Sequence, residues 1–375
     1  MKKILFSAVI AATALFTGCE DNFDAKIYGQ LTTINFPQTE ADYVSYMMDC
    51  YIPFSAYWSY NWGGVDQRPF YIPTDGPIRL LDVTTDLCAP WVDGWGGAFL
   101  HLAQCKFEEM KLYPRWPNDA QPNDYEKVRD ITRMTKIIDD IEKAEVLSDA
   151  KKKEMVAECR LLRGLEMYFL FHFYGPVPVI LDPAMVGNEE AEIGGYRPSL
   201  DEMTQYITDD LEFAAENMVE TQAEKGRYNA DYARFCLMRH YLNEGAHMQG
   251  YYQKAYEIFD KFTGNYALFT SGENPFIDQF RVANKNNSEW IMALSCSESG
   301  KGDAKTGNNF LFHYYFNNWS FNTVDDKGNP THVANLDGGG WGQCYNIDPL
   351  FYDTFEENDK RKEGCLLYTS GRCRR

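Results

Sequence analysis

Aromatic side chains that could stack on a ligand gather in stretches of the sequence that are rich in Gly, Pro and Asp. A Trp or Tyr ring can pack against the apolar C–H face of a sugar, and it loses little conformational entropy when it does so. Neighbouring amide, carboxylate and guanidinium groups can then hydrogen-bond the sugar hydroxyls. The candidates for ligand contact are Trp58, Tyr60, Trp62, Arg68, Trp91, Trp319 and Trp341.

Two segments hold these candidates, and both show little hydrophobic periodicity. Residues 52–96 contain SAYWSYNWGGVDQRPF and CAPWVDGWGG, and the later candidates lie within residues 270–363. Long ordered loops of this kind are usually functional. Each Trp has an alternative role as an apolar anchor that holds its own loop to the core. The sequence therefore leaves open which of them contact a ligand.

Motifs of the common catalytic sites are absent from the sequence. It contains no H-E-x-x-H, G-x-S-x-G, Walker or G-x-G-x-x-G motif. The six histidines are scattered, and pairs of acidic residues are expected by chance among 55 Asp and Glu. We therefore expect no catalytic residue, no metal site and no cofactor. A hydrolase, which needs only two suitably placed carboxylates, stays open as the least favoured functional class.

The composition is that of a globular, acidic protein. The chain has 375 residues, of which 45% are hydrophobic and 15% aromatic, and its formal net charge is −19. This length allows one large domain or two ordinary ones, and the hydrophobic content allows a large core. Nucleic acid is excluded as a ligand because phosphate contacts need a basic surface.

The first residues have the order of a bacterial export signal. Met1-Lys2-Lys3 is a positive start, and the apolar run from Ile4 to Phe16 is too short to span a bilayer as a helix. Gly18-Cys19 resembles a lipobox, which predicts a signal peptide over residues 1–18 and a lipid on Cys19. Residues 19–38 would then be the lipidated start and a linker. An ordinary signal peptide with an incidental cysteine is the alternative.

The other nine cysteines show no C-x-x-C pair and no regular spacing. Two of them, Cys365 and Cys373, lie at the very end of the chain, which leaves an odd number of seven. A disulfide framework is therefore not expected. Cys159 and Cys236 fall inside helical patterns and are predicted to be small, buried, apolar side chains.

Hydrophobic residues at helical spacing predict a mainly α fold. Short turns should join the helices into antiparallel hairpins, as in a tetratricopeptide-like solenoid. We expect these hairpins over about residues 97–265, and an irregular, loop-rich second part with a few short strands. The expected helices are 40–51 with a cap at Thr39 and Asp42, 97–113, 125–147, the helix from Ser148 to Tyr174, the helix opened by the Ser199–Glu202 capping box, 231–244 and 251–262.

The segment Ala157–Asp182, AECRLLRGLEMYFLFHFYGPVPVILD, is the one around which the chain is organised. Its helix should end at Gly175-Pro176. Arg163 and Glu166 are three residues apart and can pair on one helix face. Gly164 costs the helix about 1 kcal/mol relative to alanine. We therefore expect another backbone to approach the helix closely at this glycine.

This segment resembles the hallmark of SusD/RagB-like proteins, a helix of the type E-A-R-x-L-R-A-x-x-Y-F-x-L followed by Y-G-D-V-P-L. Here it reads ECRLLRG, then Tyr168-Phe169, then YGPVP, with Gly164 for the usual alanine and Pro176 for the usual aspartate. Further similar segments are GRYNADYARFCLMRHYLNEG, YYQKAYEIFDKF, the expected strand SEWIMALSCSES (residues 288–299) and YNIDPLFYDTFEENDKRKEG. The resemblance covers about residues 39–363.

The resemblance implies a non-enzymatic, lipid-anchored protein on the outer face of the outer membrane. Such proteins capture oligosaccharides, or sometimes peptides, and deliver them to a TonB-dependent transporter of the SusC type. The resemblance also implies that residues 39–375 are one domain, that the solenoid docks on the transporter, and that loops within 52–96 and 270–363 hold the ligand. The alternative is a helical-repeat lipoprotein that only assembles protein complexes.

The last twelve residues, GCLLYTSGRCRR at 364–375, do not continue this resemblance. Members of the family normally extend well beyond the segment that contains Asp359 and Arg361. Two cysteines and three arginines in the last eleven residues also break the acidic composition. We therefore expect a truncated or misread reading frame, and exposed apolar surface on the loop-rich half.

Overall fold

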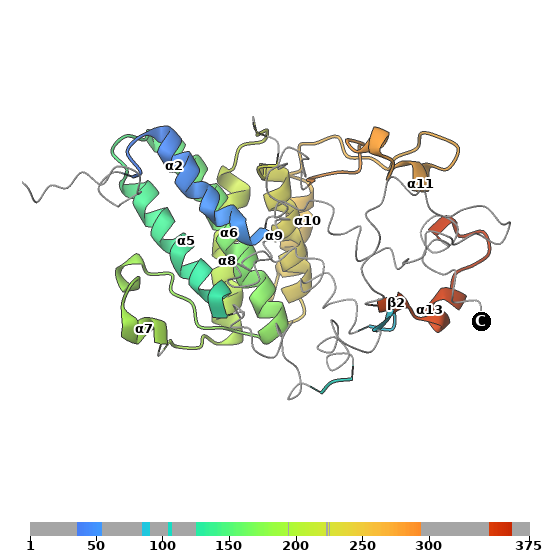
Figure 1. Cartoon of the computed structure of the whole chain (residues 1–375), viewed down its shortest axis with the longest axis horizontal. Helices are drawn as coiled ribbons and strands as arrows, with labels where there is room; N and C mark the ends of the chain where they lie inside the picture. Colours follow the sequence, from blue (N-terminus) through green and yellow to red (C-terminus); the bar gives the residue numbers. More distant parts are fainter. Residues whose placement is uncertain are drawn as a thin grey trace, which may run out of the picture.

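The structure is a computed structural model of the chain. It describes residues 36–54, 85–90, 104–106, 125–193, 195–222, 224, 226–293 and 345–361. α-Helices make up most of these residues, and Figure 1 shows the long helices side by side at one end of the molecule. The mainly α fold of packed helical hairpins is confirmed. Within the described residues, no helix combines the length and the apolar composition needed to cross a membrane.

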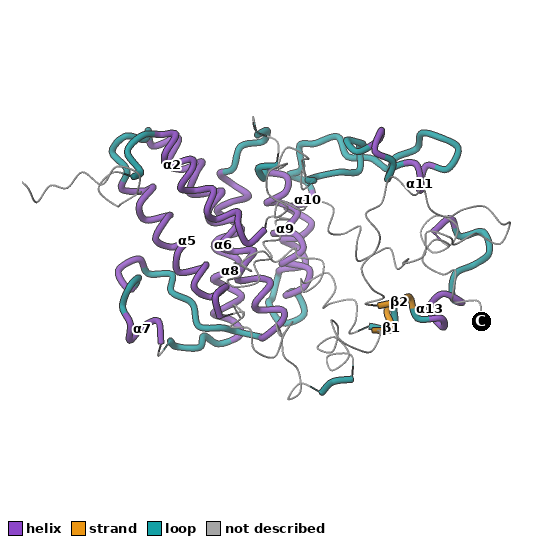
Figure 2. Tube along the Cα trace, in the orientation of Figure 1, coloured by secondary structure: helices purple, strands orange, loops and turns teal. Residues whose placement is uncertain are grey.

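Successive long helices pack on one another in chain order. α5 (Tyr125–Lys143) packs on α6 (Asp149–Tyr174), and α6 packs on α8 (Leu200–Asn217). α8 packs on α9 (Ala230–Glu244), and α9 packs on α10 (Tyr251–Phe259) (Figure 2). Short turns join α5 to α6 and α9 to α10, so each of these pairs is a helical hairpin.

The N-terminal helices contact this stack from one side. α2 (Glu40–Met47) and the 3₁₀ helix η1 (Met48–Phe54) pack on α5 and α6. The expected helix 40–51 changes to 3₁₀ geometry at Met48. In an α-helix, the ring of Pro53 would clash with the carbonyl of Asp49, so the α-helix cannot continue through this proline.

Side-chain caps begin the helices where the sequence predicts them. Thr39 with Asp42 forms a capping box at α2, and Ser199 with Glu202 forms another at α8. Ser148 Oγ accepts a hydrogen bond from Lys151 N at 3.3 Å at the start of α6. α6 ends at Gly175, whose φ of 69° lies in the left-handed region that glycine adopts without strain.

The apolar core lies between the stacked helices and under η1. Apolar side chains of α5 and α8 are buried here, and so are Cys159 and Cys236, as expected. Large side chains with almost no exposed surface include Phe54, Ile131, Met134, Ile137, Leu161, Leu162, Tyr228 and Tyr241.

Gly164 lies where α6 meets α8. A Cβ atom at this position would lie 3.0 Å from Asp210 Cβ and 3.1 Å from Leu211 Cδ2. α8 therefore approaches α6 closely at Gly164, and the nearest atoms belong to side chains rather than to the backbone that the sequence led us to expect. The spacing of the neighbouring Arg163 allows a pair with Glu166, but its guanidinium donates to Asp210 on α8 and to Thr135 on α5.

Two predicted elements differ in the structure. Gln104–Lys106 form a turn inside the helix expected over 97–113, because Cys105 has a φ of 56°. An L-residue in this left-handed conformation interrupts a right-handed α-helix. Of the strand expected over 288–299, the described residues 288–293 form turns and irregular chain.

The second part of the chain contains short elements. Its described helices are α11 (Pro275–Asp278), η4 (Val282–Asn284) and α13 (Pro349–Asp353), and its short strand β2 (Tyr345–Ile347) pairs with β1 (Cys88–Pro90). Figure 1 shows α11, β2 and α13 at the end of the molecule opposite to α5. The remaining short helices, η3 (Pro183–Met185) and α7 (Glu189–Ile193), follow α6. The irregular second part is thus confirmed for the described residues, which contain one short strand there, β2.

Candidate functional site

The site residues predicted from the sequence lie outside the described residues. This applies to the proposed lipidation site and to every candidate for ligand contact. They are Cys19, Trp58, Tyr60, Trp62, Arg68, Trp91, Trp319 and Trp341. The tail at 364–375 also lies outside them. Of the two loop-rich segments, the structure describes residues 52–54, 85–90, 270–293 and 345–361.

A two-stranded antiparallel ladder joins these two segments. Cys88 of β1 pairs with Ile347 of β2, and Pro90 pairs with Tyr345. Trp91 directly follows β1 in the sequence, and Trp341 lies four residues before β2. Segments far apart in the chain, each carrying aromatic candidates, therefore meet at this ladder.

Polar contacts of the backbone fix the end of the ladder. Asp348 N donates to the carbonyl of Leu87 at 3.1 Å, which extends the pairing by one bond beyond the strands. The Asp348 carboxylate also accepts from Leu350 N at 2.8 Å and caps α13. Pro349 occupies the first turn of this helix, where a missing N–H costs nothing. The ladder and α13 are thus held as one local unit.

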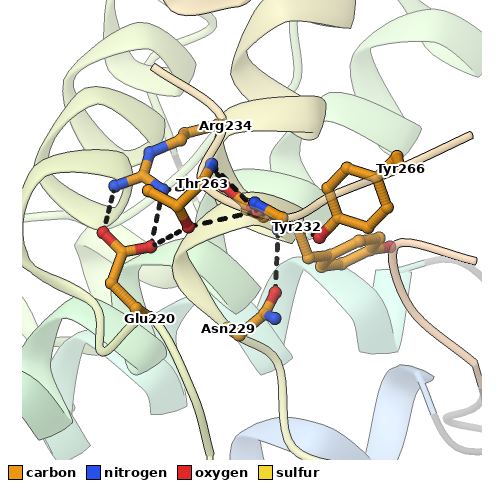
Figure 3. Close-up of polar contacts among 8 residues, drawn as sticks. Glu220, Asn229, Tyr232, Arg234, Thr263 and Tyr266 are labelled. Atoms are coloured by element: carbon orange, nitrogen blue, oxygen red, sulfur yellow. Dashed lines mark hydrogen bonds and ion pairs between the residues drawn. The ribbon is translucent and has the colours of Figure 1, made fainter.

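A second anchor lies where the chain leaves the solenoid after α10. We define the Asp231 cluster as Glu220, Asp231, Arg234, Thr263, Gly264 and Tyr266 (Figure 3). The carboxylate of Asp231 accepts from Arg234 Nη1 at 2.7 Å, from Gly264 N at 2.8 Å and from the Tyr266 hydroxyl at 3.0 Å. Burial acts to raise the pKa of Asp231, but these hydrogen bonds hold it below its usual value. A buried carboxylate on α9 therefore fixes the direction in which residues 263–266 leave the helices.

The chain beyond this anchor folds back on itself. Ala267 N donates to the Ser288 carbonyl at 3.1 Å, and Ser288 Oγ donates to the Ala267 carbonyl at 2.8 Å. Phe269 N donates to Glu289 Oε1 at 2.6 Å. The next residue, Trp290, is 42% exposed and was not among the predicted site residues, because it lies in a segment interpreted as a strand.

A groove of about 400 Å³ lies between α8, α9 and α10. Its charged lining residues are Glu212, Glu216, Arg234, Lys254, Glu257 and Lys261. Glu212 accepts from Lys254 Nζ at 2.9 Å and also from the Tyr241 hydroxyl. Burial acts to raise the pKa of Glu212, but these two hydrogen bonds lower it below its usual value. The groove is a mixed-charge polar surface without a broad exposed aromatic face.

The exposed face of α10 is aromatic. Tyr252, Tyr256 and Phe259 follow one another at spacings of four and three residues, which places them on one side of a helix. Their exposed fractions are 50%, 71% and 63%. Such a patch on a soluble surface commonly marks a contact with another molecule.

Of the described histidines, His240 is buried, whereas His172 and His247 are exposed and each lies 3.6 Å from the Glu244 carboxylate. His240 is completely buried, and its Nε2 lies 2.9 Å from Thr208 Oγ1. Burial lowers the pKa of His240 to about 4, so the ring is neutral at pH 7. No group of three His, Cys, Asp or Glu side chains suited to a metal ion occurs in the described part of the chain.

Comparisons with known proteins agree with this architecture. A SusD-like family model described as "Starch-binding associating with outer membrane" matches residues 101–242. A curated SusD-like protein from Bacteroides ovatus is 29% identical over 158 residues, which is 40% of this chain and 27% of that protein.

Solved structures share the fold at low sequence identity. Surface glycan-binding protein A from Bacteroides fluxus superposes with a TM-score of 0.58 at 20% identity, over 88% of this chain and 64% of that one. A laminarin-binding SusD-like protein superposes with a TM-score of 0.62 at 18% identity, over 88% of this chain and 66% of that one. This chain therefore spans less than two thirds of the length of these relatives. The family match over residues 101–242 and the shared fold agree with the resemblance of the segment around α6 to SusD-like proteins.

Proposed function

We propose that this protein is a non-enzymatic, surface-exposed lipoprotein that binds an oligosaccharide and passes it to a TonB-dependent outer-membrane transporter of the SusC type. The observation that carries the proposal is the pairing of β1 with β2. This pairing joins the two segments in which the sequence places exposed aromatic candidates, so that both segments can contribute to one binding surface.

The comparisons support the class of ligand. The matching family model is described as starch-binding, and two structural relatives are named for binding glycan and laminarin. An acidic chain with a net charge of −19 suits a neutral sugar better than an anionic one, because charge repulsion disfavours an anion.

Contact with the sugar is assigned to Trp58, Tyr60, Trp62, Trp91, Trp319 and Trp341, with Arg68 available to hydrogen-bond hydroxyls. An aromatic contact contributes about 0.5–1.5 kcal/mol beyond the area it buries. Replacing a contacting Trp by alanine should therefore weaken binding about tenfold.

Calorimetry with a panel of neutral oligosaccharides tests this assignment. The variants are alanine substitutions at Trp58, Trp62, Trp91, Trp319 and Trp341. Tyr256→Ala is the matched control, because it removes an exposed aromatic ring from the solenoid rather than from the loops. Unchanged affinity in all five variants would show that the assigned residues are wrong. Cleaved products found by chromatography after long incubation would refute the non-enzymatic role.

Docking on the transporter is assigned to the solenoid. The aromatic face formed by Tyr252, Tyr256 and Phe259 supports this, since aromatic residues are enriched in protein interfaces. In cells that carry the transporter, replacing all three residues by serine should reduce co-purification of a TonB-dependent transporter while glycan binding is kept. The same face also fits the second candidate function, a scaffold that only assembles proteins. A chain that co-purifies with a partner but binds no glycan would favour the scaffold.

The anchor is assigned to Cys19. The positive start, the short apolar run and Gly18-Cys19 support it. Cys19→Ala should release the protein from membranes or stall its processing. A variant that fractionates with membranes and incorporates palmitate as the parent does would refute the anchor.

A further inference from the structure

Two buried cysteines from distant parts of the chain meet inside the molecule. The Sγ atoms of Cys50 in η1 and Cys159 in α6 lie 3.8 Å apart, although the residues are 109 positions apart in sequence. Both side chains have no exposed surface, and both are free thiols in the structure. A disulfide bond is about 2.0 Å long, so the two sulfur atoms need to approach by about 1.8 Å in total.

The residues on either side of Cys50 hold η1 in register with α5 and α6. Asp49 forms an ion pair with Arg133 of α5, and the Tyr51 hydroxyl donates to Glu158, the neighbour of Cys159 in α6. Three consecutive residues of η1 thus each contact a residue of the helical stack. This register keeps Cys50 opposite Cys159 and prevents the sulfur atoms from separating by a slip of the short helix.

Local geometry allows the remaining approach. Cys159 sits in the middle of a 26-residue α-helix, which is a stiff element. Cys50 belongs to a seven-residue 3₁₀ helix, whose hydrogen-bond geometry is poorer and whose backbone yields more easily. Rotation of the two side chains together with a small shift of η1 would bring the sulfur atoms into bonding range.

The other described cysteines do not share this arrangement. Of the four cysteines whose side chains the structure describes, Cys105 is exposed in its turn and Cys236 is buried within α9. Burial raises the pKa of the Cys236 thiol to about 12. Cys236 therefore provides a matched control, being an equally buried thiol of the same helical stack that lacks the contact shown by Cys50 and Cys159.

We propose that Cys50 and Cys159 form a disulfide bond in the exported protein and that this bond fastens the N-terminal segment 36–54 to α6. The oxidant is another disulfide, which reacts with the cysteines by thiol–disulfide exchange. One cysteine thiolate attacks this disulfide and releases one thiol, and the second cysteine then displaces the other thiol from the mixed disulfide. Two cysteine thiols are oxidised to one disulfide, and the disulfide that they attack is reduced to two thiols.

Reaction takes place before η1 docks on α6. Burial raises the pKa of the Cys159 thiol well above its usual value, and the docked pair is closed to solvent. The thiols are therefore reactive in the folding chain and protected afterwards, whether or not they have reacted. That the folding chain meets an oxidising compartment rests on the proposed export. The geometry of the cysteine pair does not depend on that proposal.

In the proposed lipoprotein, segment 36–54 joins the membrane anchor at Cys19 to the folded helices. Without the bond, this connection depends on side-chain contacts such as Asp49–Arg133. With the bond, a covalent crosslink also holds segment 36–54 against α6. The crosslink reduces the chain entropy lost on folding, because it already closes a long loop in the unfolded state.

Peptide mapping on the full-length chain tests the bond directly. The purified protein is folded in a mixture of oxidised and reduced glutathione, denatured in the presence of N-ethylmaleimide, digested and examined by mass spectrometry. We expect a linked pair of peptides that carry Cys50 and Cys159 and that separates on reduction. Both cysteines fully modified by N-ethylmaleimide after oxidative folding would overturn the proposal. This mapping uses no glycan, so it is independent of the proposed binding function.

Thermal unfolding of protein that has been refolded either with oxidised glutathione or with dithiothreitol tests the consequence, because the docked pair is closed to solvent and has to be reduced before folding. The parent and Cys236→Ala should lose at least about 5 °C of unfolding midpoint on reduction, because closing a loop of this length is strongly stabilising. Cys50→Ala and Cys159→Ala should show midpoints that do not depend on the reductant. An equal unfolding midpoint of the parent under both conditions would overturn the fastening role. If either variant fails to fold, peptide mapping of the parent still decides whether the bond forms.

Discussion

Arg163 of α6 and Asp210 of α8 form a buried, two-pronged ion pair at the centre of the solenoid. Arg163 Nε donates to Asp210 Oδ2 and Nη2 donates to Asp210 Oδ1, each at 2.8 Å. Arg163 Nη1 also donates to Thr135 Oγ1 at 3.0 Å, and Thr135 donates in turn to the carbonyl of Ile180. One side chain of the hallmark segment therefore ties together α5, α8 and the extended chain that follows α6.

Removal of the Asp210 charge should destabilise the protein strongly. Asp210→Asn leaves the guanidinium of Arg163 buried without its counter-charge, and breaking a buried pair in this way costs about 3–5 kcal/mol. Urea unfolding followed by circular dichroism measures the loss. Asp209→Asn is the matched control, because Asp209 is the exposed neighbour, and it should change stability by less than about 0.5 kcal/mol. Equal stabilities of the two variants would contradict the role of this pair.

Gly164→Ala should destabilise the protein although alanine is the better helix former. Alanine gains about 1 kcal/mol of helix propensity, but its methyl group would lie 3.0 Å from Asp210 Cβ. Arg160 and Arg163 both hold Asp210 in place, so this atom cannot yield. Overpacking of this kind costs about 1–3 kcal/mol, which predicts a net loss of up to about 2 kcal/mol.

A double-mutant cycle separates this steric effect from helix propensity. Leu211 Cδ2 is the second close neighbour of the added methyl group, at 3.1 Å. In a Leu211→Ala background, the cost of Gly164→Ala should fall measurably in urea unfolding. A stabilising effect of Gly164→Ala in the parent would show that α6 and α8 can move apart.

Acid should weaken the fold through His240. Burial lowers its pKa from 6.5 to about 4, so between these values the unfolded chain binds a proton that the native protein does not. Stability is therefore fully present above pH 6.5 and is lost as the pH falls, by about 2 kcal/mol between pH 7 and pH 5. Burial also raises the pKa of Glu244, which acts in the opposite direction.

Comparison of the parent with His240→Gln isolates the contribution of this histidine. Stability measured by urea unfolding at pH 7 and pH 5 should fall less in His240→Gln than in the parent. His247→Gln, which replaces an exposed histidine just beyond the same helix, should leave the parental difference in place. An identical pH dependence in the parent and His240→Gln would contradict the assignment.

Asp231→Asn should loosen the exit of the chain from the solenoid. The amide side chain keeps the shape of the carboxylate but loses the charge that accepts from Arg234, Gly264 and Tyr266. Hydrogen bonds to a charged group contribute about 1.5–3 kcal/mol each, so hydrogen exchange at the Thr263 and Gly264 amides should become at least about tenfold faster. Asp260→Asn, at an exposed position just after α10, is the control. Unchanged exchange in Asp231→Asn would show that other contacts hold this segment.

The sequence by itself determined the features that depend on near neighbours in the chain. The capping boxes at Thr39 and Ser199, the cap at Ser148 and the end of α6 at Gly175 all form as predicted. Each involves groups within four residues of one another, so residue type and spacing suffice to specify it.

Only the tertiary structure decided which distant residues meet. Arg163 had a local candidate partner in Glu166, but the packing of α6 on α8 supplied Asp210, whose buried carboxylate needs a counter-charge. No spacing in the sequence predicts the contact between Cys50 and Cys159. The ladder between β1 and β2 likewise depends on backbone groups, which every residue carries, so no residue type marked the place where the two loop-rich segments join. Long-range pairing is set by the shape of the folded chain, and that shape is a property of all the helices packed together.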